Sequence, residues 1–233
     1  LEQIPESIGV AIKLAVKKLL DDPALMSHFP VDVFQTGSGT SSNMNANEVL
    51  ATLASNISGE KVGANDHINC GQSSNDIIPT TIHVSAALAL QEDLLPALHH
   101  LVTITRKKAV SVDHYIKTGR THLMDAMPVR LSQSLNGWAD QIEQNIQRLA
   151  AMQPDLQSLA QGGTAVGTGI NAHPDFATKF NRTLSSLTDL QFTPAENFFT
   201  HIGSQDIAVA LSGQLKATAV SIIKIANDLR WMN

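Results

Sequence analysis

Four glycine-containing segments, rich in hydroxyl and amide side chains, are the parts of this sequence best suited to chemistry. They are residues 37–45 (GSGTSSNMN), 72–76 (QSSND), 119–122 (GRTH) and 162–171 (GGTAVGTGIN). The first two stand where a helix is expected to begin, so free backbone N–H groups and the helix dipole favour an anion there. The first lacks a Gly-Lys-Ser/Thr ending, which excludes a nucleotide P-loop. For each of these two segments alone, ordinary helix capping is the alternative.

His122 is the side chain in these segments best suited to moving protons, because the ordinary pKa of histidine is near 6.5. As one histidine of nine, it is by default a surface or packing residue. No zinc pattern is present, because Cys70 has no cysteine partner and the adjacent His99 and His100 point in different directions on a helix. We therefore expect neither a metal nor a cofactor.

The elements that must hold these segments are helices. Apolar residues at helical spacing predict helices over 5–20, 41–57, 77–112, 131–160, 175–190 and 204–232. Thr40 or Ser41 should cap the second helix, and Pro96 and Pro154 should interrupt the third and fourth. Residues 117–130 indicate a hairpin, 194–202 an irregular segment, and Val31–Gln35 a possible short strand. The fold class predicted is mainly α, a bundle of long antiparallel helices with small irregular or hairpin excursions.

Composition narrows the function classes. The net charge of −5 argues against a nucleic-acid partner, and the longest apolar run, Ala86–Leu90, is too short for a membrane span. A single cysteine and a start without signal-peptide layout favour the cytoplasm. Charged residues make up only 16% of the chain, and between Ile207 and Leu229 they number three. So apolar a helix is the core of a large monomeric bundle or of an oligomer, and we favour the oligomer.

Taken in order, the four segments resemble those of class II fumarase, the fumarate hydratase of the aspartase/fumarase superfamily. The resemblance runs across essentially all 233 residues, including Lys224–Trp231. It implies the long-helix bundle of that superfamily, with an N-terminal helical domain at 1–72 and a central bundle domain at 73–233. It also implies a homotetramer whose active sites are shared between subunits. The implied reaction is the reversible anti hydration of fumarate, a small dicarboxylate, to (S)-malate in the tricarboxylic acid cycle.

The resemblance also implies roles for single residues. His122 matches the histidine assigned to proton handling, and the matched substrate-binding residues are Ser38, Gly39, Thr40, Ser73, Ser74, Asn75 and Thr121. Many fumarases have a secondary anion site at a His-Pro-Asn-Asp segment. The matching stretch here is 63–66 (GAND), so Asn65 and Asp66 remain while the histidine and proline are replaced. That secondary site is therefore doubtful.

Two alternatives stay open beside fumarase. One is an aspartase or another lyase of the superfamily; aspartases resemble the chain closely but usually carry Gln where this chain has His122. The other is a non-catalytic helical oligomerisation module, which would keep the same fold. The chain begins at Leu1 and ends at Asn233 without a helix-stop signal, so we expect it to be part of a longer subunit. The family's signature loop, with its serine base and its substrate-binding lysine and asparagine, is not found in these residues. We accordingly expect the 233 residues alone to be inactive.

Overall fold

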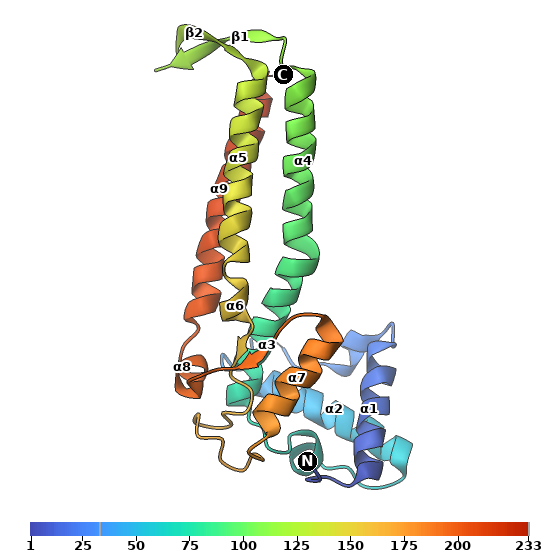
Figure 1. Cartoon of the computed structure of the whole chain (residues 1–233). Coiled ribbons are helices and arrows are strands. Elements are labelled where there is room, and N and C mark those ends of the chain that lie inside the picture. Colours follow the sequence, from blue (N-terminus) through green and yellow to red (C-terminus); the bar gives the residue numbers. More distant parts are fainter. Residues whose placement is uncertain (33, 233) are drawn as a thin grey trace. The chain divides into compact units, whose positions relative to one another are not determined.

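The computed structural model of the protein describes residues 1–32 and 34–232 and is mainly α-helical, as predicted (Figure 1). It divides into two compact units. Unit 1 comprises Leu1–Val84 and Gln157–Gln205, and unit 2 comprises Ser85–Leu156 and Asp206–Asn233. These limits differ from the boundary expected between residues 72 and 73, because residues 157–205 return to unit 1. The division into domains 1–72 and 73–233 stays a prediction.

Unit 1 opens with two helices that pack through small side chains. α1 (Glu6–Leu20) and α2 (Thr40–Ser58) confirm the predictions for 5–20 and 41–57. Their shared core contains Ala11, Ala15 and Ala54, all at most 3% exposed. The prediction that Thr40 or Ser41 caps α2 is wrong: Gly39 is the N-cap and has no side chain that could accept a hydrogen bond, and Thr40 already belongs to the helix. The amide of Ser41 instead donates to Thr36 Oγ1 at 3.2 Å.

The rest of unit 1 alternates short elements with loops. In chain order these are the 3₁₀ turn η1 (Leu25–His28), the π turn η2 (Ala64–Ile68), most of α3 (Ser74–Ala89), β3 (Ser158–Leu159), α7 (Phe176–Thr188), β4 (Thr193–Pro194) and α8 (Phe198–Gly203). β3 and β4 pair in parallel. The segment 194–202, expected to be irregular, contains α8, because the Asn197 side chain caps it by accepting from Phe199 N at 3.0 Å. Of the possible strand Val31–Gln35, Val33 lies outside the described residues, and the other four residues form no strand.

Unit 2 is built from long helices and one hairpin. α3 runs into the π turn η3 (Leu90–Leu94) and then α4 (Leu95–Ser111), so the predicted interruption lies at η3, just before Pro96. Pro96 itself is in the first turn of α4, where proline is tolerated. β1 (Ile116–Thr121) and β2 (Met124–Arg130) form the predicted hairpin. α5 (Leu131–Ala150) and α6 (Gln153–Leu156) follow, separated close to Pro154 as expected, and α9 (Asp206–Met232) completes the unit.

α5 is the central helix of unit 2, with α4 and α9 both packed along it (Figure 1). Its buried stripe includes Ile142, Ile146 and Leu149, spaced three to four residues apart. The contact with α9 also holds a polar group centred on the buried Asn145, which donates to Ser221 Oγ at 3.1 Å and accepts from Gln214 Nε2 at 3.0 Å. Because a buried amide needs its partners, this group fixes which turn of α9 faces which turn of α5.

α9 exposes most of its apolar residues. Only Leu211 and Thr218 are buried, whereas Val209, Val220 and Ile223 are each more than half exposed. Among the described residues, α9 is therefore not the buried centre of the bundle. By length and composition alone α9 could also cross a membrane, although the core helices of soluble proteins can be equally long and apolar.

Candidate functional site

The beginnings of α2 and α3 lie together in unit 1 and bring two of the predicted binding segments side by side. Ser38 and Thr40 share a hydrogen bond between their hydroxyl oxygens at 3.1 Å. Asn43, one turn into α2, donates from Nδ2 to Ser74 Oγ at 3.3 Å. A Cβ on Gly39 would lie 2.8 Å from Ile78 Cδ1, and the φ of Gly39 is +72°. Glycine is therefore required where the two helix starts approach.

The third binding segment of unit 1 is the glycine loop 162–169, which contacts the start of α3. Asn75 donates from Nδ2 to the carbonyl of Ala165 at 2.8 Å, and its backbone amide donates to Ser73 Oγ at 3.2 Å. Asn75 is exposed, so the rest of its side chain is available to a ligand. Three of the four segments identified in the sequence thus meet in one unit.

Asp76 is the residue of this site that the sequence reasoning left without a role. It is completely buried. Its Oδ1 accepts from Ser73 N at 2.9 Å, and its Oδ2 accepts from Gly162 N at 3.1 Å and Thr164 N at 2.8 Å. Burial raises the pKa of the Asp76 carboxyl, and the hydrogen bonds from the amides of Ser73, Thr164 and Gly162 oppose that rise. The Ser-x-x-Asp spacing of a capping box was a signal that could have found half of this arrangement.

A pocket of about 380 Å³ opens beside these residues. Polar and apolar groups both line it, and most of the lining residues carry amide or hydroxyl side chains: Asn65, Asn69, Gly71, Gln72, Ser73, Thr164, Ala165, Ile170 and Asn171. Thr164 is 3% exposed and its Oγ1 has no hydrogen-bond partner. Asn65, from the doubtful secondary anion site, therefore shares a pocket with Ser73. Asp66 is exposed and does not line this pocket.

Thr121 and His122 belong to unit 2, at the turn of its hairpin. His122 and Leu123 are the two turn residues, with φ of +48° and +63°. Positive φ at both positions is the type I′ pattern, which usually takes Asn and Gly, so a His-Leu turn carries backbone strain. Thr121, His122 and Leu123 are all exposed. The hairpin therefore presents His122 outward at its tip, where a proton-transfer group is accessible to a ligand.

The base of the hairpin is fastened by a polar cluster. Asp113 accepts from Ser132 Oγ at 2.6 Å and from Arg130 Nη1 at 2.9 Å, and Leu131 N donates to Tyr115 O at 3.0 Å. The hydrogen bond from Ser132, followed by the charge of Arg130, lowers the pKa of the Asp113 carboxyl. This cluster joins the end of α4 to the start of α5, so it sets the direction in which β1 and β2 leave the helices.

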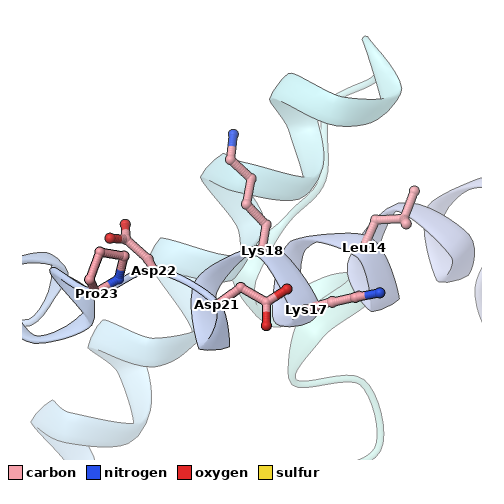
Figure 2. A pocket seen from close by; sticks show the side chains of 6 residues that line it. All are labelled: Leu14, Lys17, Lys18, Asp21, Asp22 and Pro23. Carbon is pink, nitrogen blue, oxygen red and sulfur yellow. The ribbon is translucent and has the colours of Figure 1, made fainter.

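Unit 1 offers neutral hydrogen-bond donors, and the hairpin of unit 2 offers an exposed histidine for proton transfer. Among the described residues, no three His, Cys, Asp or Glu side chains converge as metal ligands. A larger hollow of about 550 Å³ lies at the end of α1 (Figure 2), lined by Leu14, Lys17, Lys18, Asp21, Asp22 and Pro23. None of the predicted site residues lines it, and its two lysines and two aspartates cancel in charge, so it is a poor candidate for binding an anion.

Comparisons with known proteins identify relatives of this chain. The profile of a family described as Lyase (Lyase_1) matches residues 1–233. Fumarate hydratase class II 2 of Pseudomonas aeruginosa is 63% identical over all of this chain and 51% of its own length. The mitochondrial fumarate hydratase of Saccharomyces cerevisiae is 44% identical over 98% of this chain and 49% of its own length.

A solved structure shares the fold as well. The class II fumarase of Schistosoma mansoni superimposes with a TM-score of 0.93 at 36% identity, covering 97% of this chain and 52% of its own. The chain thus spans about half the length of the relatives it matches. A full-length match to the family profile, together with the shared helical fold, shows that this chain belongs to the Lyase_1 family of lyases.

Proposed function

We propose that this chain is part of a fumarate hydratase, which adds water reversibly to fumarate to give (S)-malate. The observation that carries the proposal is the meeting of three donor-rich segments at the starts of α2 and α3. The 63% identity to a fumarate hydratase class II supports it over the whole chain. The step of the tricarboxylic acid cycle that interconverts these two acids is the corresponding biological role.

The chemistry explains why such donors are needed. Fumarate is a dianion, and the hydration passes through a carbanion-like species with extra negative charge on one carboxyl group. Fixed N–H and O–H donors aimed at that carboxyl group stabilise the transition state more than the substrate. We assign this role to Ser38, Gly39 and Thr40 at the start of α2, and to the donors that follow at the start of α3. These last are Ser73, Ser74 and Asn75.

We assign proton handling to His122 and substrate contact to its neighbour Thr121. His122→Asn tests the first assignment without disturbing the turn, because Asn tolerates the φ of +48° at this position. Loss of a general acid or base typically costs about 10²- to 10⁴-fold in rate. We expect kcat for fumarate hydration by the natural gene product to fall within that range. His99→Asn, on the exposed surface of α4, is the matched control. An unchanged kcat in His122→Asn would remove this residue from the mechanism.

One assay separates the three candidate functions. The natural gene product is given malate or aspartate, and fumarate formation is followed by ultraviolet absorbance. Turnover of malate alone supports fumarate hydratase, and turnover of aspartate alone supports an aspartase-type lyase. No turnover of either substrate supports a non-catalytic oligomerisation module and contradicts the proposal.

The partner proposed for the exposed face of α9 is other copies of the same chain, in a homotetramer. A membrane is the less favourable partner, because Lys216 is exposed midway along α9 and a lysine at the centre of a bilayer costs about 2.5–3.5 kcal/mol. Size-exclusion chromatography with light scattering tests the tetramer.

A cytoplasmic location is proposed from the single cysteine, and neither a nucleic acid nor a cofactor is part of the proposal. The doubtful secondary anion site at Asn65 and Asp66 also stays a proposal.

A further inference from the structure

The carboxylate of Asp76 stands at the junction of two segments that are far apart in the sequence. Oδ1 accepts from Ser73 N at the start of α3, and Oδ2 accepts from Gly162 N and Thr164 N in the glycine loop. Each oxygen therefore binds a different segment. A helix cap alone uses one oxygen and does not need burial, so the cap does not explain why this carboxylate is completely inaccessible.

The burial of Asp76 is energetically costly. A carboxylate taken out of water loses its hydration, and the hydrogen-bond partners that the structure gives Asp76 are backbone amides rather than a cationic side chain. Three N–H donors compensate for part of this cost, in line with the opposing effects of burial and hydrogen bonding on its pKa. The effect of these hydrogen bonds is to fix the distance between the glycine loop and α3.

The loop needs such a fixed point, because its backbone is held in unusual conformations. Gly162 and Gly167 have φ of +107° and +97°, and Thr164, which is not a glycine, has φ of +57°. Gly167 N and Gly169 N both donate to the Gly163 carbonyl, at 2.9 and 3.1 Å, which closes the loop on itself. The two amides that Oδ2 holds lie on either side of Gly163. Asp76 thus grips the loop at the point from which the rest of it folds.

The glycine loop directly contacts the residues to which we assign substrate binding. Ala165, the next residue after Thr164, accepts the hydrogen bond from Asn75 Nδ2. Ser73 and Thr164, whose amides both donate to Asp76, line the same 380 Å³ pocket. A shift of the loop relative to α3 therefore moves Asn75 and changes the wall opposite Ser73.

We infer that Asp76 is a positioning residue, whose buried carboxylate locks the glycine loop 162–169 to the first turn of α3 and so sets the Ser73 and Asn75 donors for substrate. The statement that Ser73 and Asn75 bind substrate rests on the proposed function, whereas the statement that Asp76 holds the loop to α3 does not. Asp76 itself has no exposed atom with which to touch a ligand. Its effect on the reaction passes through Asn75 and Ser73.

The test compares Asp76→Ala and Asp76→Asn in the natural gene product, with Asp189→Asn as the matched control. Asp189 is an exposed carboxylate of the same unit with φ of +55°, where Asn is well tolerated. Alanine removes both acceptors. Asparagine keeps the shape and one acceptor oxygen, which can face either Ser73 N or the two loop amides but not both. We therefore expect the asparagine variant to be intermediate.

Two measurements are made on each variant. Hydrogen exchange followed by mass spectrometry should show faster exchange in peptides covering 162–168 for Asp76→Ala, less so for Asp76→Asn, and no change for the control. Steady-state kinetics with fumarate should show KM raised about tenfold or more in Asp76→Ala, since misplacing a binding group by 1 Å can cost about 10²-fold. A purely structural defect lowers the active fraction and hence the apparent kcat, while KM stays unchanged.

Each outcome decides the inference. Faster exchange confined to residues 73–77 makes Asp76 a helix cap only and overturns the inference, as does an unchanged KM in a folded Asp76→Ala. If Asp76→Ala does not fold, the wild-type protein decides: amides of Gly162 and Thr164 that exchange as fast as free peptide amides refute the lock. If the wild-type protein does not turn over fumarate, the proposed function fails. The hydrogen-exchange data then still test whether Asp76 holds the glycine loop to α3.

Discussion

Replacing Gly162 with alanine tests whether the glycine loop is held as tightly as the structure indicates. A Cβ at Gly162 would lie 2.5 Å from Ala177 Cβ and 3.2 Å from Ala177 Cα. Real Cβ atoms do not approach so closely, and Ala177 has no flexible side chain that could move aside. Because Ala177 belongs to α7, either the helix or the loop must shift. The φ of +107° adds a second penalty that only glycine avoids.

The magnitude follows from these two terms. Holding a non-glycine residue in such a backbone region costs about 1–3 kcal/mol. Forcing an extra methyl group into a packed site costs about 1–3 kcal/mol more. Gly162→Ala should therefore lower the free energy of unfolding by about 2–6 kcal/mol, the sum of the two ranges. Since domains are stable by about 5–15 kcal/mol, the variant should fold but melt at lower temperature.

Urea unfolding at fixed protein concentration measures the effect. Gly137→Ala, in α5, is the control: no atom lies within 4 Å of its added Cβ, so it should gain about 0.5–1 kcal/mol from helix propensity. The double variant Gly162→Ala/Ala177→Gly removes the 2.5 Å contact but keeps the φ penalty. We expect it to recover about 1–3 kcal/mol beyond additivity. A Gly162→Ala variant as stable as wild type would refute the reasoning, and strict additivity would refute the steric part.

Two further predictions concern unit 2. The lowered pKa of Asp113 means that its charged form stabilises the folded state above the ordinary value of 3.8, and that this stabilisation disappears as the pH falls through the folded-state pKa below 3.8. The melting temperature of Asp113→Asn should thus lie below that of wild type at neutral pH and approach it in acid, and a pH-independent difference would contradict this. Asn145→Leu leaves Gln214 and Ser221 without their partner, and should lower the free energy of urea unfolding by about 1–3 kcal/mol, whereas an unchanged value would show that this polar group is dispensable.

Local sequence patterns were sufficient where local physics decides the structure. The apolar spacing of 5–20 and 175–190 predicted α1 and α7 to within two residues, and the glycine and proline of 117–130 marked the hairpin. The π turn at 90–94 was displaced from the expected break at Pro96, because proline is compatible with the first turn of the helix that follows. Helix α8 was missed because six residues are too few to show a period.

The candidate site was only partly predictable for a different reason. Segments 37–45, 72–76 and 162–171 were found from their residue types, and the resemblance to a known family assigned roles within the first two. Their meeting depends on bonds between residues far apart in the sequence, such as Asp76 with Gly162 and Thr164, which no local pattern encodes. The burial of α9 was likewise undecidable, because an apolar helix has the same sequence whether its own chain or another copy covers it.

The charges around the pocket give a physical reason for a shared active site. Its lining among the described residues contains amides, hydroxyls and backbone, and no Lys or Arg, while Asp76 beside it is a carboxylate already surrounded by N–H donors. Neutral donors can orient a dicarboxylate, but two negative charges leaving water need a nearby cation or many strong donors. In the proposed function, unit 1 orients the substrate, and further donors or a cation come from residues outside this pocket. The proposed homotetramer, in which other copies complete each site, would supply such groups and would link the exposed apolar face of α9 to the chemistry of the donor loops.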